Sequence, residues 1–111
     1  MGQRRRARVI GDAQANARVL AMALESRKAE IGIYGTASGT PYVWKSDGTR
    51  PGTDLAPNFI PKGSSQMSYS VTITGVGITY SMTVMDAALS NASVLTTDQS
   101  GTITLDAVYN K

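Results

Sequence analysis

The sequence contains no cysteine and no histidine among its 111 residues. Without cysteine the chain has neither disulfides nor thiolate metal sites, and without histidine it lacks the side chain that most often acts as a base near neutral pH. We therefore expect no enzyme and no bound cofactor. A hydrolase that pairs a serine with a lysine base is the catalytic alternative that stays open.

Long apolar runs are also missing: nothing approaches the roughly 18 to 20 residues that cross a bilayer, and the opening Met-Gly-Gln-Arg-Arg-Arg lacks the apolar stretch of a signal peptide. We expect a soluble polypeptide. Hydrophobic residues make up 41% and charged residues 17% of the chain, which is ordinary globular usage. A length of 111 residues suits a single domain with one core, spanning residues 1–111.

Positive charge is concentrated at one end of the chain. The net charge is +3, and residues 1–31 hold seven Lys and Arg against three Asp and Glu. Four arginines fall within five positions: Arg4, Arg5, Arg6 and Arg8. Such a cluster could neutralise the phosphates of DNA, but on a helix these side chains point in different directions. A solvated membrane-proximal or subunit-contact role is therefore preferred to nucleic-acid binding.

Residues 4–34 are predicted to form one long helix, because they are rich in alanine and contain no proline. The helix should stop near Gly32 and Gly35, since glycine accepts the left-handed conformation that ends helices. Its first turns are expected to project beyond the domain. The apolar stripe comprises Ile10, Ala13, Ala17, Leu20, Leu24 and Ile31. The polar face includes Asp12, Asn16, Arg18 and Glu25.

Residues 35–66 are predicted to be a long loop, rich in turn-forming Gly, Ser, Thr, Pro and Asp. Its aromatic residues, Tyr42, Trp44 and Phe59, could form a stacking platform for bases or sugars, although anchoring the loop to the core is favoured. Asp47 and Asp54 could contribute to a calcium site, but calcium prefers about six to eight oxygens. Turn capping is therefore the favoured role of these two carboxylates.

Residues 67–109 are predicted to form an antiparallel sheet, because apolar and polar residues alternate there. The first strand should bury Met67, Tyr69, Val71 and Ile73, and after a turn at Gly75-Val76-Gly77 the second should bury Ile78, Tyr80, Met82 and Val84. Residues 92–97 form a possible third strand, and a fourth would carry Ile103, Leu105, Ala107 and Tyr109. The predicted fold class is α+β, with the long helix packed on a three- or four-stranded antiparallel sheet.

Residues 4–35 resemble the segment that follows the membrane helix in type IV pilins and pseudopilins. The likeness lies in Arg6-Ala7-Arg8, in Asp12-Ala13-Gln14-Ala15-Asn16-Ala17, in Leu20-Ala21-Met22-Ala23-Leu24-Glu25 and in Tyr34-Gly35. The order of helix, loop and antiparallel strands also matches a pilin head. The resemblance implies a pilin-like fold and a structural filament subunit from which an N-terminal membrane helix of about 20 apolar residues has been removed.

The resemblance also implies partners and location. Other pilin subunits and an inner-membrane assembly machinery would be the partners, and the subunit would sit in the bacterial inner membrane before joining a cell-surface or periplasmic filament. Many major pilins close a C-terminal loop with a disulfide, which this chain cannot form. A major pilin, a minor pilin and a pseudopilin therefore all remain open.

The candidate assembly or DNA-binding residues are those expected on the exposed start of the helix: Arg4, Arg5, Arg6, Arg8, Val9, Ile10 and Asp12. The alternative function is a DNA-binding minor pilin acting in DNA uptake, which would use the same arginines together with the loop aromatics Tyr42, Trp44 and Phe59.

Overall fold

The computed structural model describes residues 3–106, except for the side chain of Gln3. Helix α1 runs from Gln3 to Ile31 over 29 residues, which at 1.5 Å per residue gives about 43 Å. The longest dimension of the molecule is also 43 Å. The helix ends at Ile31, just before the predicted glycine Gly32 and three residues before the expected end at residue 34. Gly32 takes φ = 89°, and its amide donates to the Lys28 carbonyl.

Within the described residues five strands follow in the order β1-β2-β3-β4-β5, each antiparallel to its neighbour. Their bounds are β1 Tyr42–Lys45, β2 Met67–Thr74, β3 Thr79–Asp86, β4 Ala92–Asp98 and β5 Thr104–Leu105. Short 3₁₀ turns, η1 Gly75–Gly77 and η2 Ala87–Leu89, join β2 to β3 and β3 to β4. The α+β class is confirmed, but the strand count of three or four is wrong, because part of the predicted loop forms β1 as an additional edge strand.

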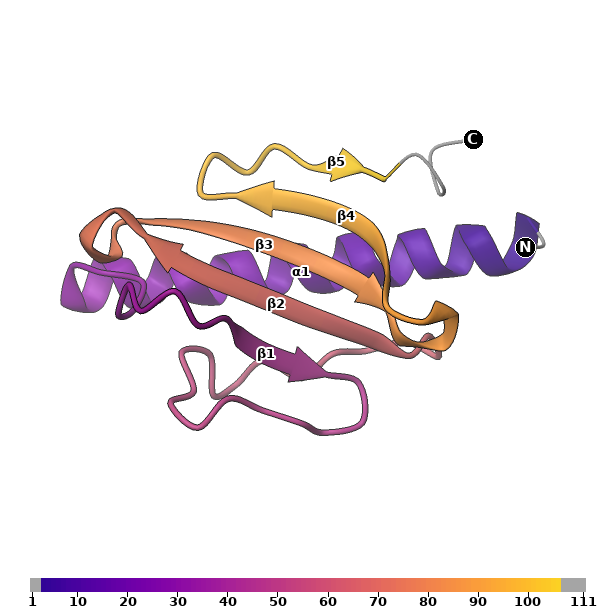
Figure 1. Cartoon of the computed structure of the whole chain (residues 1–111), viewed down its shortest axis with the longest axis horizontal. Coiled ribbons are helices and arrows are strands. Elements are labelled where there is room, and N and C mark those ends of the chain that lie inside the picture. The colour runs from indigo at the N-terminus through magenta and orange to yellow at the C-terminus, as the bar shows by residue number, and fades with distance from the viewer. Residues whose placement is uncertain (1–2, 107–111) are drawn as a thin grey trace.

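Helix α1 crosses one face of the sheet, and the opposite face is uncovered in the described part of the chain (Figure 1). The apolar side chains at the interface form one core. The helix contributes Val9, Ala13, Ala17, Leu20 and Leu24. The alternating residues Met67, Tyr69, Val71 and Ile73 of β2 and Tyr80, Met82 and Val84 of β3 are all buried against it, as predicted.

Several predicted core positions differ. Val9 is buried and Ile10 only half-buried, so the helix faces the sheet slightly differently from the prediction. Ile31 lies on the last turn and is 52% exposed. Ile78 precedes β3 as the residue after η1 and is 48% exposed. Ile103 and Leu105 pack against the core as half-buried residues, whereas Ala107 and Tyr109 lie outside the described residues.

The third predicted strand is confirmed as β4, and it carries an irregularity that periodicity could not reveal. Val84 pairs with Leu95 but the next residue, Met85, pairs with Ser93, so Val94 is an extra residue in β4. This β-bulge lets two consecutive side chains, Val94 and Leu95, both reach the core with no exposed surface. The bulge explains why the alternation of residues 92–97 is weak.

Candidate functional site

The start of α1 projects past the sheet at the end where the N-terminus lies (Figure 1). Arg4 and Arg8 are exposed there. Because they are four residues apart, they lie on the same side of the helix, one turn from each other. These two arginines are the part of the predicted basic cluster that is fully presented to the surroundings.

Arg5 instead ties the helix to the sheet. Its Nη2 lies 2.7 Å from Oδ2 of Asp86, at the end of β3, and the side chain of Asp86 has no exposed surface. The other oxygen, Oδ1, accepts from the Ala88 amide at 3.0 Å and so caps η2. A buried carboxylate needs such partners, so Arg5 is a structural residue. Arg6 is half-buried and also has an interaction partner.

The remaining predicted assembly residues also face the domain itself. Val9 is 1% exposed and belongs to the core, so its side chain does not reach the surface. Ile10 is half-buried against the same core. Asp12 accepts a hydrogen bond from the Ser65 amide at 3.1 Å. Beside it Gly63 adopts φ = 108°, and a Cβ atom there would come within 2.4 Å of the Asp12 carboxyl group.

Asn16, expected on the polar face, is 5% exposed and binds the loop that precedes β2. Its Nδ2 donates to the Lys62 carbonyl at 2.7 Å and to the Tyr69 hydroxyl at 2.8 Å. Its Oδ1 accepts from the Lys62 amide at 2.9 Å. The side chains of Asp12 and Asn16 therefore hold residues 62–65 against the helix through hydrogen bonds.

The outer face of α1 is the surface that the sequence analysis did not single out. Gly11, Ala15, Val19 and Met22 follow one another at helical spacing and are all exposed. Val19 is 51% and Met22 69% exposed, so the stripe presents apolar side chains to solvent. Exposed Arg8 and Arg18 lie beside it on the same side of the helix. The sequence contains this stripe as a second set of apolar residues at helical spacing, on a different side of the helix from the core stripe.

The loop aromatics anchor the loop to the core, which was favoured over a stacking platform for bases or sugars. Trp44 has no exposed surface and Phe59 is 1% exposed, so neither ring can stack with a base or a sugar. Phe59 packs edge-to-face between Trp44 and Tyr69, with centroid distances of 6.2 and 5.7 Å. Tyr42 is half-buried, and its hydroxyl donates to the Thr36 carbonyl at 3.3 Å.

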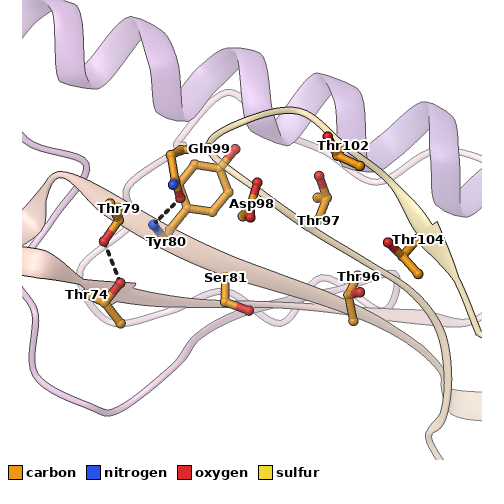
Figure 2. Close-up of a pocket in the computed structure, with 10 residues that line it drawn as sticks. All are labelled: Thr74, Thr79, Tyr80, Ser81, Thr96, Thr97, Asp98, Gln99, Thr102 and Thr104. Atoms are coloured by element: carbon orange, nitrogen blue, oxygen red, sulfur yellow. Dashed lines mark hydrogen bonds between the residues drawn. The ribbon is translucent and has the colours of Figure 1, made fainter.

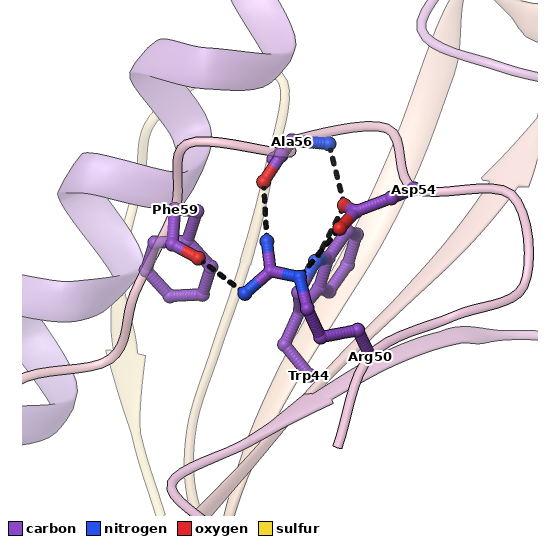
Figure 3. Close-up of polar contacts among 5 residues, drawn as sticks. All are labelled: Trp44, Arg50, Asp54, Ala56 and Phe59. Atoms are coloured by element: carbon purple, nitrogen blue, oxygen red, sulfur yellow. Dashed lines mark hydrogen bonds and ion pairs between the residues drawn. The ribbon is translucent and has the colours of Figure 1, made fainter. Parts of the chain in front are cut away.

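Arg50, which no sequence motif singles out, organises the loop after β1 (Figure 3). Its guanidinium donates to Asp54, to the Phe59 carbonyl at 2.7 Å and to the Ala56 carbonyl at 2.8 Å. Asp54 also accepts from Trp44 Nε1 at 2.9 Å. Burial alone would raise the pKa of Asp54, but the hydrogen bonds from Arg50, Trp44 and the Ala56 amide outweigh it and lower the pKa.

Both loop carboxylates accept hydrogen bonds from neighbouring groups. Asp54 is occupied by the contacts above, and Asp47 accepts from the amide and hydroxyl of Thr49 at 2.9 and 2.6 Å, as turn capping requires. These hydrogen bonds lower the pKa of Asp47. Across residues 3–106 no three Asp, Glu, His or Cys side chains come together in a way that could hold a metal ion.

A cleft of about 490 Å³ opens on the outer face of the sheet, between β3 and the β4–β5 turn (Figure 2). Hydroxyl groups dominate its lining, which comprises Thr74, Thr79, Tyr80, Ser81, Thr96, Thr97, Asp98, Gln99, Thr102 and Thr104. Asp98 accepts from the Ser100 hydroxyl and amide, which lower its pKa.

A second hollow is apolar and flanks the outer face of α1. This groove, of about 280 Å³, lies between the helix and the β4–β5 turn. Its apolar walls are formed by Ala17, Ala21, Met22 and Ile103. Thr97 of β4 and Gly101 of the turn also line it, and Arg18 borders it. The groove therefore continues the apolar outer face of the helix sideways onto the sheet.

No family model, no curated protein and no solved structure matches the chain. Helix α1 is long enough to reach across a bilayer but too polar to do so, and the described residues contain no other helix of that length.

Proposed function

We propose that this chain is the head of a structural subunit of a type IV pilus or a related secretion or competence filament. The observation that carries the proposal is the two-sided character of α1. Its inner stripe is buried on the sheet, while its outer face exposes Gly11, Ala15, Val19 and Met22 and its first turns project beyond the domain. A helix that only completed a single globular domain would present mainly polar residues on that face, whereas here exposed apolar residues are interspersed with Arg8 and Arg18.

The proposed mechanism is packing rather than chemistry. Small residues such as Gly11 and Ala15 allow another backbone to approach the helix closely, and Val19 and Met22 then offer apolar surface to bury. Neighbouring subunits would pack along this face, with the uncovered sheet face pointing outward. The subunit would wait in the bacterial inner membrane, be added by an assembly machinery, and end in a cell-surface or periplasmic filament.

The DNA-binding alternative has a narrower basis. Arg4 and Arg8 are exposed, but Arg5 is paired with Asp86 and the aromatic rings of Trp44 and Phe59 are buried. Two exposed arginines on one helical turn would give weak, salt-dependent contact with phosphates. Filament packing therefore uses more of the observed surface than DNA binding does.

Assembly from the full gene in cells tests the proposal. Ala15→Arg places a large charged side chain in the middle of the outer face, and arginine is a good helix former, so the head should still fold. We expect this variant to abolish filaments seen by electron microscopy. Ser81→Arg, on the exposed outer face of β3, is the matched control and should leave them intact. Filaments that tolerate Ala15→Arg as well as Ser81→Arg would refute the proposal.

A further inference from the structure

The β2–β3 tip, residues 75–78, exposes apolar side chains on a strained backbone. Val76 is 85% exposed and Ile78 48% exposed. Val76 adopts φ = 54° and ψ = 30°, between Gly75 and Gly77 at φ = 56° and 93°. A β-branched residue rarely takes this left-handed conformation, whereas glycine or asparagine accepts it readily. The fold itself therefore gains nothing from valine at this position.

An exposed apolar side chain held in a strained conformation suggests presentation to a partner. The tip is also firmly placed: the Tyr34 amide donates to the Gly77 carbonyl at 2.7 Å, which joins the tip to the chain leaving α1. A Cβ atom on Gly77 would come within 2.7 Å of the Gly35 carbonyl oxygen, so the contact is close-packed. Val76 and Ile78 thus project from a rigid support at the C-terminal end of the helix.

The apolar groove beside α1 has the matching character. Its volume of about 280 Å³ exceeds the ~150 Å³ in which a protein cavity can hold a benzene ring, so two branched aliphatic side chains can enter. Charged side chains occur close to both surfaces. Exposed Arg18 borders the groove, and the last turn of α1 carries exposed Glu30 and also Lys28, whose Nζ lies 5.8 Å over the Tyr34 ring.

We propose that the β2–β3 tip of one copy of this chain inserts Val76 and Ile78 into the groove of a second copy, between Met22 and Ile103. This inference rests on the proposed filament function and names one of its subunit contacts. The tip and the groove occupy different places on the same molecule, and in a filament we expect them to meet head to tail. A head-to-tail contact leaves a free tip and a free groove at the two ends of each pair, and its repetition builds an open chain when the rotation between copies does not close a ring.

The contact should be weak in isolated heads. Two aliphatic side chains bury far less than the roughly 1,200 Å² of a stable interface. In a filament the contact would repeat and act together with packing along the outer face of α1. A test on the head therefore needs to capture a transient complex rather than wait for a stable one.

Disulfide trapping suits this chain because it contains no cysteine. One preparation carries Val76→Cys and another carries Met22→Cys, and the two are mixed at high concentration under mild oxidation. We expect mixed dimers to exceed both homodimers, because a disulfide forms where Cα atoms approach within about 4.4–6.8 Å. A double variant should give a ladder of oligomers. Val76→Cys mixed with Ser81→Cys, an exposed site on the sheet, is the control and should show only collisional background.

A second variant separates partner binding from a purely structural role of Val76. Val76→Asn should raise the thermal midpoint of the head, because asparagine tolerates the left-handed conformation. Introduced into an Ile78→Cys chain, it should lower trapping with Met22→Cys by about tenfold, as expected for the loss of a buried valine side chain. A fall in the midpoint, or unchanged trapping, would contradict the inference.

The outcomes distinguish the two proposals. Mixed dimers at background, or Met22→Cys homodimers in excess, would overturn the tip-in-groove contact and leave the filament function standing. Filaments that survive Ala15→Arg would refute packing along the outer face of α1, whatever the trapping result.

Discussion

Replacing Asn16 by alanine should destabilise the domain by about 2 kcal/mol, although the residue lies among helix positions that look polar and exposed. The side chain makes three hydrogen bonds, to the amide and carbonyl of Lys62 and to the Tyr69 hydroxyl. Each contributes roughly 1 kcal/mol net. Alanine recovers about 0.5 kcal/mol through its higher helix propensity. Lys62 is exposed, so water can replace part of the hydrogen bonding that its backbone loses, and the net cost falls to about 2 kcal/mol.

Chemical denaturation measures this free energy, and the thermal midpoint should fall by about 8 °C for a domain of this size. Ser26→Ala is the matched control on an exposed position of the same helix and should change stability by less than about 0.5 kcal/mol. Hydrogen exchange adds a local signature, since the Lys62 and Ser65 amides should exchange faster in Asn16→Ala. If Asn16→Ala matched the control in both measurements, the strapping of residues 62–65 to the helix would be refuted.

Three further predictions concern the loop, the core and the basic end. Arg50→Lys should lower the free energy of unfolding by about 2 kcal/mol in denaturation experiments, because lysine cannot reproduce the guanidinium hydrogen bonds to Asp54 and two carbonyls. An unchanged denaturation midpoint would show that the loop does not depend on those hydrogen bonds. Burial raises the pKa of Tyr69 and Tyr80 to about 12. The unfolded chain releases these protons near pH 10, so the free energy of unfolding should fall as pH rises from about 10 to 12. Denaturation at several pH values, combined with tyrosinate absorbance, measures this, and a free energy of unfolding that stays constant over that range would contradict the prediction. Arg4→Ala with Arg8→Ala should leave filaments intact while removing any salt-dependent gel shift of DNA; a strong shift at physiological salt that these changes abolish would favour the DNA-uptake alternative.

The main elements were predictable because their signals are local. The glycines after Ile31 end α1, and the alternation in residues 67–74 and 80–84 gives β2 and β3 with the expected faces inward. Strand β1 was missed because its four residues are surrounded by turn formers. What makes Tyr42–Lys45 a strand is its pairing with Val71–Ser68, which local sequence does not encode.

The roles of individual side chains were less predictable, because they depend on partners distant in the chain. Four clustered arginines look equivalent in the sequence, and only the position of Asp86, 81 residues after Arg5, shows that one of them is structural. Asn16 is buried because a loop 46 residues away folds over it. The apolar outer face of α1 was readable from the sequence, but which of two apolar periods faces the sheet is decided by packing.

Electron cryomicroscopy of filaments from cells that express the full gene tests the central claim most directly. The account predicts that this chain is found in the filament, with the outer face of α1, including Ala15 and Val19, packed against neighbouring subunits and the open sheet face directed outward. A filament in which α1 faces solvent and the sheets make the contacts would contradict it, as would filaments that lack the chain.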